Sequence, residues 1–584
     1  MNYTLNTEKK NGSVLAALKK LLPLLKYERQ RLFITFAAII INSGLTLVAP
    51  LLIGEAVNKY IETKQVHGLL VASATVLLIY IGSFIATYIQ TKTMGGVGQR
   101  LLFSLRNTVF EKLQQLPIAF FNQNKAGDLI SRINNDTDNL NQFFSQSLMQ
   151  FVGNIFLIVG AVVFILSINF RLGLAALVPL VIVLLLTQVL SPWVKRQNAK
   201  SLKEVGGMSA EIQESLGNFK VIVAFNRRDY FREKFEAANY KNFITSVKAG
   251  IANNVFVTIY SFASNAAQLI VLVYGIHLIL IGDFTLGFLI SYITYANRLY
   301  DPLRQMASLW ATFQTAMASW DRISAIVSLQ NDMPLLAGSA AHSLSGPRLS
   351  FQTVGFTYVD GKEVLRDVSV SLNPGETYAL VGPTGGGKTT TASLMARLYD
   401  PTGGTILFEG NDIRTLDPAT RAQKIGFILQ EPFLFTGTLG DNIFYSNPLY
   451  KDSTSEQLVE VLKETELLPL LAQFENGLKT PVNQNGESIS LGQRQLIAFM
   501  RAVLRKPDLI ILDEATANID TVTERLLEEV IEKLPKQTTK VIIAHRLNTI
   551  QNADEIFFVN GGAITPAGSL TNAVDMLMHA KRTS

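Results

Sequence analysis

The sequence predicts a multidomain chain, in which an all-α transmembrane domain of six helices precedes an α/β domain of the phosphate-loop class. Three observations lead to this fold class. Long apolar stretches recur through the first 320 residues, strands alternate with helices from about residue 345, and a glycine-rich loop follows one of those strands. A chain of 584 residues is also too long for one compact domain.

The composition fits a membrane-embedded front half. Hydrophobic residues make up 48% of the chain and charged residues only 17%, against about 25% charged in average soluble proteins. The net charge of +6 favours contact with an anionic lipid surface over nucleic acid, so we expect no nucleic-acid partner. The chain has no cysteine, which excludes disulfides, thiolate metal sites and cysteine nucleophiles.

Six apolar stretches are long enough to cross a membrane as helices, since about 20 residues span the hydrocarbon and a helix satisfies its own backbone there. They lie at about 32–56, 68–92, 145–168, 172–194, 251–281 and 285–310. Buried core helices of a soluble protein are the alternative, which six such stretches disfavour. We therefore place the transmembrane domain at residues 1–320, a linker at 321–345 and the α/β domain at 346–584.

The basic residues ahead of the first stretch predict a cytoplasmic N-terminus. With six spans the C-terminal half is cytoplasmic too, and a bacterial inner membrane is expected. Leucines recur at helical spacing beside lysines over residues 14–25, which predicts a helix lying on the inner membrane surface. A solvated helix with a small apolar stripe is the alternative.

Long polar segments separate the second stretch from the third and the fourth from the fifth. Helices that continue from the membrane into the cytoplasm would explain both segments. Each pair of helices would reverse near the middle of its segment, around residues 117–127 and around residues 208–217.

A phosphate-binding loop follows the predicted strand Tyr378–Val381 and precedes a helix. Glycines there let backbone N–H groups face phosphate oxygens, and the helix N-terminus adds its positive end. Lys388 would reach the β- and γ-phosphates, and Thr389 would ligate Mg²⁺. The nucleotide-binding residues predicted here are Gly382, Pro383, Thr384, Gly385, Gly386, Gly387, Lys388, Thr389 and Thr390. A glycine-rich turn without function is the alternative.

Two acids end a second predicted strand, Leu509–Leu512. An acid at the end of a buried strand beside a phosphate loop suits Mg²⁺, and Asp513 takes this role. Glu514 is then placed to polarise the attacking water as the catalytic base. Acids also favour the first turn of a helix, so a solvated helix-start acid is the alternative for Glu514.

Three further residues have weaker signals. His545, at the end of the predicted strand Val541–Ala544, could bond the γ-phosphate, or be a structural histidine. Gln430, after the predicted strand Ile425–Leu429, could touch Mg²⁺ or the attacking water. Tyr358 could stack on adenine, although an aromatic residue in a strand more often belongs to the core.

These residues, in this order, resemble the ATP-binding-cassette family over nearly the whole chain. Ile489-Ser490-Leu491-Gly492-Gln493 is similar to its signature sequence, Phe356-Thr-Tyr358 to its aromatic loop, and Leu509 to Glu514 to its Walker B strand. Gln430 resembles the Q-loop, Ala517-Asn-Ile-Asp520 the D-loop and His545 the switch histidine. The resemblance implies ATP and Mg²⁺ as cofactors. It also implies that Ser490, Gly492, Gln493 and Asp520 contribute to nucleotide binding.

The front half resembles the six-helix exporter type, through Phe120-Phe121-Asn-Gln-Asn-Lys-Ala-Gly-Asp128 and Ile130-Ser-Arg132. In that family two chains close head to tail over two ATP molecules, and each site joins one phosphate loop to the other chain's signature. The resemblance therefore implies an ATP hydrolase coupled to outward transport by alternating access, with a second half-transporter as partner. The family's coupling helices would fall near residues 117–127 and 208–217.

The sequence departs from this family in its signature. Leu491 replaces the usual glycine, and a leucine adds bulk and restricts the backbone. Residues 482–486 before it also lack the expected glycine–glutamate pair. We expect poor hydrolysis at the site that uses this signature, while this chain's own Glu514 and His545 are intact. A heterodimer with a different subunit would explain that combination, and a homodimer with tolerated variation is the alternative.

Polar or aromatic residues within the predicted spans are Asn42, Gln188, Tyr260, Asn265, Gln268, Tyr292 and Asn297, with Glu55 near an outer end. They could line a cavity or join helices by hydrogen bonds. A largely apolar cavity with few charges suits amphiphilic drugs or lipid-like compounds. A homodimeric lipid or peptide exporter is an alternative. An ATP-gated channel or regulator is disfavoured by Glu514, and an importer by the fusion of both domains.

Overall fold

The computed structural model describes residues 3–5, 28–337, 346–359, 361–483, 489–513, 521–532, 534–543 and 551–579. The chain forms two compact units. The helical unit comprises Leu5–Gln114 and Ala126–Ser328, and the α/β unit comprises Met1–Thr4, Gln115–Lys125 and Leu329–Ser584. The short segment Gln115–Lys125 therefore packs with the α/β unit, although long helices flank it in sequence.

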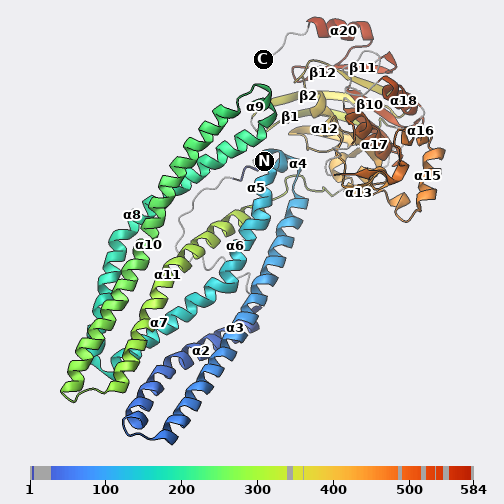
Figure 1. The fold of residues 1–584 in the computed structure, drawn as a ribbon. Coiled ribbons are helices and arrows are strands. Elements are labelled where there is room, and N and C mark those ends of the chain that lie inside the picture. The colour runs from blue at the N-terminus through green and yellow to red at the C-terminus, as the bar shows by residue number, and fades with distance from the viewer. Residues whose placement is uncertain are drawn as a thin grey trace. The chain divides into compact units, whose positions relative to one another are not determined.

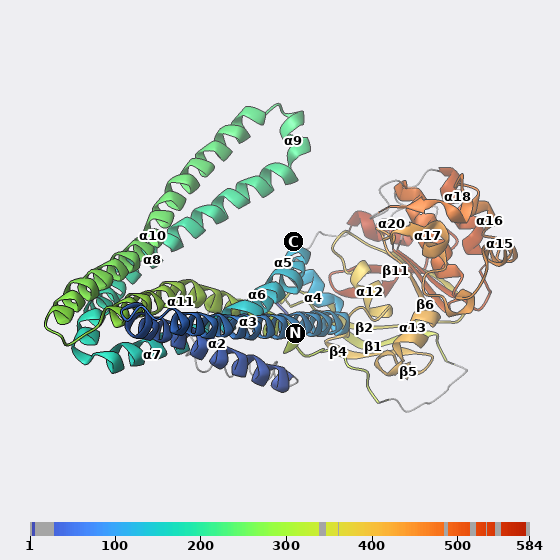
Figure 2. The same ribbon diagram turned by 60° about the horizontal axis from the view of Figure 1, so that its bottom comes forward.

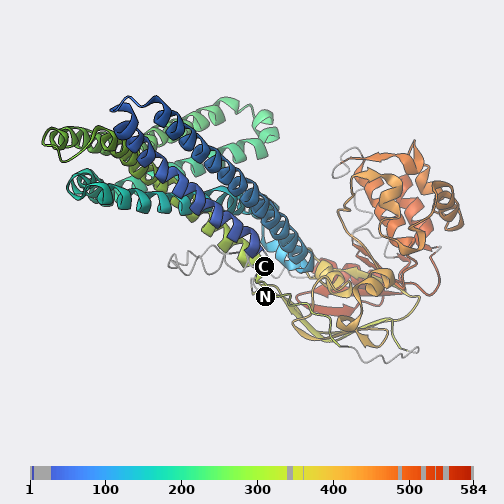
Figure 3. The same cartoon turned by 90° about the horizontal axis from the view of Figure 1, so that it is seen from below.

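Long helices that run lengthwise beside one another make up the helical unit (Figures 1 and 3). They are α2 (Arg29–Ala56), α3 (Val66–Gln115), α7 (Leu148–Ile168), α8 (Phe170–Gly217), α10 (Arg228–Leu280) and α11 (Leu286–Val327). A π-helical turn, η2 (Val57–Ile61), extends α2. The segments that lead into α7 are α5 (Ala126–Ser131), η3 (Arg132–Asp136), α6 (Thr137–Gln142) and η4 (Phe143–Ser147).

Among the described residues, five helical segments are long and apolar enough to cross a membrane, namely Arg29–Ile61, Val66–Gln115, Ala126–Ile168, Phe170–Gly217 and Arg228–Leu280. They contain the first five predicted stretches. The sixth prediction, 285–310, falls on α11, which is a continuous helix but is not one of the five. Asn297, Arg298 and Asp301 interrupt its apolar run. A membrane crossing by α11 therefore stays a prediction.

The first predicted reversal is confirmed, and the second is wrong in position. The chain turns between α3 and α5 through α4 (Ile118–Gln123), inside the predicted range. In contrast, α8 runs on to Gly217, and α9 (Phe219–Ala224) joins it to α10 (Figure 2). Gly206 and Gly207 lie within α8. Each costs a helix only about 1 kcal/mol relative to alanine, too little to end a helix that packs along α10.

Buried tyrosines of α11 hold the helical unit together. Tyr292 donates to the carbonyl oxygen of Asn169 at 2.7 Å, Tyr295 to that of Leu47 at 2.5 Å, and Tyr300 to that of Ala176 at 3.2 Å. All three rings are at most 2% exposed. A phenol buried in an apolar region needs such a partner, because an unpaired hydroxyl is costly there. These bonds attach α11 to α2, to α8 and to the turn between α7 and α8.

The described residues of the α/β unit form three sheets. The six-stranded sheet has the order β12-β11-β3-β10-β9-β6, and all its pairs are parallel except β11 with β12. Its strands are β3 (Thr377–Val381), β6 (Ile425–Ile428), β9 (Leu509–Asp513), β10 (Thr539–Ile543), β11 (Glu555–Asn560) and β12 (Ala563–Pro566). An antiparallel sheet consists of β1 (Leu349–Thr357), β2 (Glu363–Leu372), β4 (Gly403–Phe408) and β5 (Asn411–Asp412). The strands β7 (Gly437–Thr438) and β8 (Pro481–Val482) form a third, two-stranded sheet.

Helices connect and cover these strands. The longer ones are α12 (Lys388–Met395), α13 (Pro418–Lys424), α14 (Leu439–Ile443), α15 (Ser455–Glu464), α17 (Leu491–Val503), α18 (Thr521–Glu532) and α20 (Leu570–His579). The shorter turns are α16 (Leu468–Leu471), η5 (Ile413–Thr415), η6 (Pro448–Tyr450) and η7 (Gly477–Lys479).

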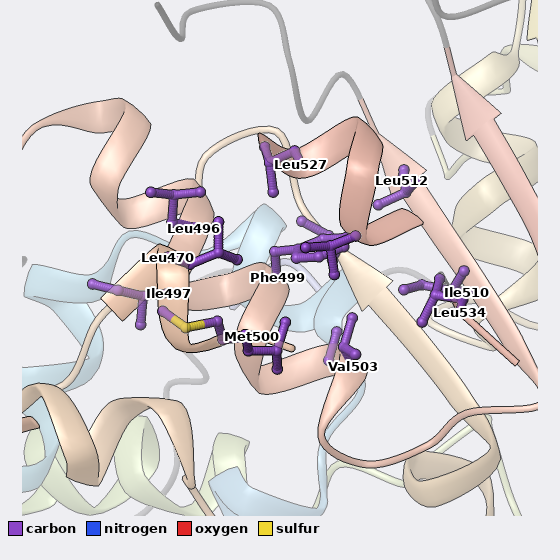
Figure 4. Close-up of a cluster of buried hydrophobic side chains, with 14 of the residues drawn as sticks. Leu470, Leu496, Ile497, Phe499, Met500, Val503, Ile510, Leu512, Leu527 and Leu534 are labelled. Atoms are coloured by element: carbon purple, nitrogen blue, oxygen red, sulfur yellow. The ribbon is translucent and has the colours of Figure 1, made fainter. Parts of the chain in front are cut away.

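Two hydrophobic clusters lie on opposite faces of the six-stranded sheet, because side chains alternate along each strand. Ile510 and Leu512 of β9 point into one cluster, with Leu496 and Phe499 of α17 (Figure 4). Leu509 and Ile511 point into the other cluster, shared with the antiparallel sheet and α12. The sheet is thus buried on both faces, which explains why its strands are continuous apolar runs in the sequence.

The predicted parallel sheet is confirmed. The predicted strands Tyr378–Val381, Leu509–Leu512 and Ile425–Leu429 correspond to β3, β9 and β6, and Val541–Ala544 corresponds to β10, with Ala544 outside the described residues. The antiparallel sheet is an addition to the predicted fold. Helix α11 continues to Val327, so the first residues of the predicted linker are helical.

Candidate nucleotide-binding site

The predicted phosphate loop joins the end of β3 to the start of α12, as the sequence pattern requires. Several of its positions need glycine, and two of them show the reasons. Gly387 has φ +109°, which is a left-handed conformation that side chains disfavour. A Cβ on Gly386 would lie 2.6 Å from the carbonyl oxygen of Val559 in β11. The backbone therefore packs against the sheet without side chains, at a helix N-terminus that suits an anion, and the Gly386 N–H donates to the Pro383 carbonyl oxygen at 3.1 Å within the loop.

Lys388 begins α12 and is only 6% exposed. Its Nζ donates to the carbonyl oxygens of Gly382 at 2.8 Å and Pro383 at 3.1 Å. These bonds hold the ammonium inside the loop, where it faces the concave backbone. Thr389 is exposed beside it, while Thr390 is buried. The loop, the ammonium and the exposed hydroxyl fit a triphosphate with a bound divalent cation.

Asp513 ends β9 and is 3% exposed. In the sheet register Ile543 of β10 pairs with Leu380 on one side and with Asp513 on the other. Asp513 therefore stands level with the end of β3, two strands away, which is about 10 Å. Carboxyl ends of parallel strands share one edge, so this acid and the phosphate loop meet there. A buried carboxylate at that edge fits the predicted Mg²⁺ ligand.

Gln430 follows β6, whose Ile428 pairs with Leu512 of β9. It lies two residues beyond that pair, at the same sheet edge, and is exposed. The side chain of Gln495, on α17, donates to the Gln430 carbonyl oxygen at 3.5 Å. The sheet thus brings three predicted features to one edge, namely the phosphate loop, Asp513 and Gln430.

Tyr358 follows β1 and lies beside the phosphate-loop helix. Its hydroxyl shares a hydrogen bond of 3.0 Å with the Oγ1 of Thr390. Its ring packs edge-on against Phe356 at 4.8 Å and Tyr399 at 5.7 Å. A cavity of about 470 Å³ adjoins it, lined among others by Val359, Tyr399 and Thr402. Tyr358 is thus half-buried, and both the adenine-stacking role and the core role remain open for it.

The signature residues lie at the start of α17. Ser490 is its N-cap: its Oγ accepts the N–H of Gln493 at 3.2 Å, and the Gln493 side chain accepts the N–H of Ser490 at 3.1 Å. Leu491 and Gly492 are half-buried in the first helical turn. Within the described part of the chain, no hydrogen bond joins Ser490, Gly492 or Gln493 to the phosphate loop. The signature therefore forms a separate, capped helix N-terminus.

The predicted catalytic base Glu514, the D-loop residue Asp520 and the switch histidine His545 lie outside the described residues, as does Gly486. Tyr399 is a site residue that the sequence analysis missed. It contacts Tyr358, and its hydroxyl accepts a bond of 2.8 Å from Asn122 in α4. Burial raises the pKa of the Tyr399 phenol. No local pattern marks this residue, because its partners are far away in sequence.

The polar residues of the helical unit divide into two groups. Asn42 and Tyr292 join helices, Asn42 by accepting the Ser83 hydroxyl at 2.5 Å. Gln268 of α10 donates to Asn297 of α11 at 2.6 Å. This pair lines a polar hollow of about 190 Å³, together with Tyr260, Ser264, Asn265, Tyr300, Asp301 and Arg304. Glu55 lies near Lys59 at 3.8 Å, and Gln188 is exposed on α8.

In a comparison with known proteins, one family model matches the membrane part of the chain and another matches the α/β part. Residues 32–303 match the model of the ABC transporter transmembrane region, and residues 365–517 match that of the ABC transporter ATP-binding domain. The uncharacterised ABC transporter ATP-binding protein YfiC of Bacillus subtilis is 32% identical over 546 residues, covering 92% of this chain and 89% of that protein.

Two relatives carry functional names. A fatty acid ABC transporter ATP-binding/permease protein of Mycobacterium tuberculosis is 32% identical, over 85% of this chain and 78% of that protein. A multidrug resistance ABC transporter ATP-binding and permease protein of Lactococcus lactis is 31% identical, over 91% and 88%. The phosphate-loop edge, the fused apolar helices and these full-length matches place the chain in the ATP-binding-cassette transporter family, as an integral membrane half-transporter of the exporter type whose ATPase domain is coupled to transport.

Proposed function

We propose that the chain is the catalytically intact subunit of a heterodimeric exporter of amphiphilic, multidrug or lipid-like compounds in a bacterial cell membrane, with both termini cytoplasmic. The observation that carries the proposal is the single sheet edge that gathers the phosphate loop, Asp513 and Gln430. Half-transporters of this family generally work as dimers, so the proposal concerns the identity of the partner.

Each site residue has a proposed role. Lys388 binds the β- and γ-phosphates, and Thr389, Asp513 and Gln430 would hold Mg²⁺, which would neutralise charge on the phosphates. Glu514 positions and polarises the attacking water, His545 contacts the γ-phosphate, and Tyr358 contacts adenine. The signature residues Ser490, Gly492 and Gln493, with Asp520, serve the site shared with the partner. The capped N-terminus of α17 supports this last role, because its N–H groups suit an anion.

The catalytic base gives the first prediction. Glu514→Gln keeps the shape of the side chain but removes its basicity, so ATPase turnover of the assembled transporter falls about 10²–10⁴-fold. Turnover is measured as phosphate release, with Glu475→Gln, an exposed acid of the same unit, as the matched control. Unchanged hydrolysis in Glu514→Gln contradicts the assignment.

The same assay on the purified single chain tests the heterodimer. We expect weak ATPase activity from this chain alone and strong activity only with a different half-transporter. Robust turnover of the chain alone, with equal activity at two sites, would establish a homodimer instead and overturn this part of the proposal.

The signature gives the second prediction. Leu491 is the first residue of α17 and is half-buried, so its side chain restricts the helix end that faces an anion. Leu491→Gly should raise ATP hydrolysis at the site that uses this signature on the order of tenfold, which corresponds to about 1.4 kcal/mol of barrier. Leu468→Gly, at the first position of α16, is the control for loss of a leucine at a helix start. Equal or lower turnover in Leu491→Gly argues against a weakened signature.

The polar hollow supports an amphiphilic substrate, because its amides, hydroxyls and opposite charges lie within otherwise apolar helices. Asn297→Ala removes the acceptor of Gln268 and one hydrogen-bonding group. The test adds an amphiphilic dye as transported compound and measures how it stimulates ATPase activity. The dye concentration that gives half-maximal stimulation should rise about 2–10-fold, which is the value of one hydrogen bond. Asn254→Ala, whose amide bonds only its own helix at Gly250, is the control. Equal shifts in both variants would exclude the hollow as a substrate contact.

A further inference from the structure

Tyr3 is one of the largest fully buried side chains in the protein, although it stands at the third position of the chain. It is 1% exposed. The first residues of a domain are normally exposed unless specific contacts hold them in place. Tyr3 belongs to the α/β unit, together with the segment that contains α4. Its burial therefore shows that the start of the chain is a structural part of that unit.

Two segments far apart in sequence hold Tyr3. On one side, its N–H donates to the Gln123 side chain at 2.8 Å, and its carbonyl oxygen accepts the Asn124 amide at 3.0 Å. Its ring packs perpendicular to the fully buried Phe120 of α4, with centroids 6.2 Å apart. On the other side, its hydroxyl donates to the Asp332 carboxylate and accepts the Asp332 N–H at 3.1 Å. Tyr3 thus bridges α4 and the residues that lead into the first strand of the α/β unit.

Helix α4 in turn reaches the nucleotide site. Asn122 donates to the Tyr399 hydroxyl at 2.8 Å, and Tyr399 packs on Tyr358. The Tyr358 hydroxyl bonds Thr390 in the phosphate-loop helix. A continuous set of contacts therefore runs from Tyr3 through α4 to α12. The two helices next to α4 in sequence, α3 and α5, belong to the helical unit. This makes α4 the segment through which a change at the nucleotide site passes along the chain.

We propose that Tyr3, with Gln123, Asn124 and Asp332, forms an N-terminal clasp that fixes α4 to its own nucleotide domain and so positions it for coupling ATP hydrolysis to transport. Tyr3 is a positioning residue, since it acts through α4. The proposal rests on the ATP-coupled transport of the family and not on the proposed substrate or partner.

The hydroxyl is the specific part of the clasp. Burial and the Asp332 carboxylate together raise the pKa of Tyr3 to about 12, so the phenol stays a protonated donor at neutral pH. Tyr3→Phe keeps the ring on Phe120 and loses the hydroxyl's bonds, which go to Asp332 and, at 3.5 Å, to the Gln330 carbonyl oxygen. Tyr3→Ala loses both the ring contact and these bonds. The loss of coupling between ATP hydrolysis and transport is therefore expected to increase from wild type through Tyr3→Phe to Tyr3→Ala.

The first test is direct, because the sequence has no cysteine. Thr4→Cys with Asn124→Cys places two thiols next to the peptide that bonds Asn124 to Tyr3. In the full-length transporter, mild oxidation should close an intramolecular disulfide in most molecules, and Thr4→Cys alone, which has no second thiol, should give none. Failure of the first pair to cross-link overturns the clasp.

The second test measures coupling. In membrane vesicles, Tyr3→Ala should lower the dye transported per ATP hydrolysed at least threefold, with KM for ATP unchanged and Tyr3→Phe in between. Tyr450→Ala is the matched control, because Tyr450 also packs edge-on against a phenylalanine of the same unit, Phe444 at 5.5 Å. It should keep the wild-type transport ratio. A wild-type ratio in Tyr3→Ala, or an equal loss in Tyr450→Ala, overturns the proposal.

A third measurement needs no transported dye. Lys125 is exposed just after α4, so trypsin cleavage there reports on this segment. ATP with vanadate should change the cleavage rate at Lys125 in the wild type and leave it unchanged in Tyr3→Ala; the same response in both contradicts the clasp. If the wild-type transporter moves no dye but shows this response, the proposed substrate class fails while the clasp stands.

Discussion

Lys388→Ala should reduce ATPase turnover of the assembled transporter about 10²–10³-fold, the usual cost of removing one preorganised group that stabilises charge. Lys388 is 6% exposed, and its ammonium is held inside the phosphate loop by the carbonyl oxygens of Gly382 and Pro383. It is a positive charge held at the phosphate loop. Without it, the negative charge of the β- and γ-phosphates lacks its nearest side-chain counterion.

A thermal unfolding measurement distinguishes a loss of ATP binding in Lys388→Ala from a loss of folding. Saturating ATP should raise the unfolding temperature of the wild-type transporter, because a ligand that binds only the folded state stabilises it. The Lys388→Ala variant should unfold near the wild-type temperature without ATP and gain little when ATP is added. Lys479→Ala, an exposed lysine of the same unit, should behave as wild type. A full ATP-dependent gain with normal turnover in Lys388→Ala would show that the loop lysine is not needed.

The parts of the fold that the sequence predicts are those with a local signal. The strands β3, β9 and β10 are unbroken apolar runs, because the sheet is buried on both faces. The antiparallel sheet has no such signal. Leu349 of β1 pairs with Leu372 on one side and with Phe408 on the other. Irregularities near Thr353 and Asp367, which both have positive φ, also break the alternation of side chains.

In the candidate site, too, the sequence predicts only the parts that have a local signal. The phosphate loop and Asp513 are readable, since each directly follows a strand in sequence. The contact between Tyr399 and Asn122 and the burial of Tyr3 depend on residues brought together over hundreds of positions. The second predicted reversal, around residues 208–217, falls inside α8, because this helix continues to Gly217 along α10. Only tertiary structure supplies this information.

Arg132→Ala should destabilise the helical unit by about 1–3 kcal/mol, because it removes the hydrogen bonds of a buried guanidinium to Asp128 and to the Arg322 carbonyl oxygen. The Arg132 side chain is 3% exposed and donates to Asp128 at 2.8 Å and to the Arg322 carbonyl oxygen at 2.7 Å. Arg322 pairs with Asp128 at 2.6 Å and with Asp136 at 3.3 Å. Two acids and two arginines thus balance one another, and Asp136 is only 5% exposed. Loss of Arg132 leaves one excess negative charge in this buried group.

The chain offers a matched control for this effect. Arg106 pairs with Asp138 at 3.0 Å in the same unit, but both side chains are more than a third exposed. Exposed pairs contribute about 0–1 kcal/mol, so Arg106→Ala should change stability little. Thermal unfolding of the detergent-solubilised transporter, followed by loss of the monodisperse peak in size-exclusion chromatography, compares the two variants. Equal changes of the unfolding temperature in Arg132→Ala and Arg106→Ala would mean that burial does not distinguish the two ion pairs. A much larger loss of stability in Arg132→Ala means that the contact between η3 and α11 depends on this arginine. The sequence alone shows Arg132 only as part of the segment Ile130-Ser-Arg132, which resembles the exporter type.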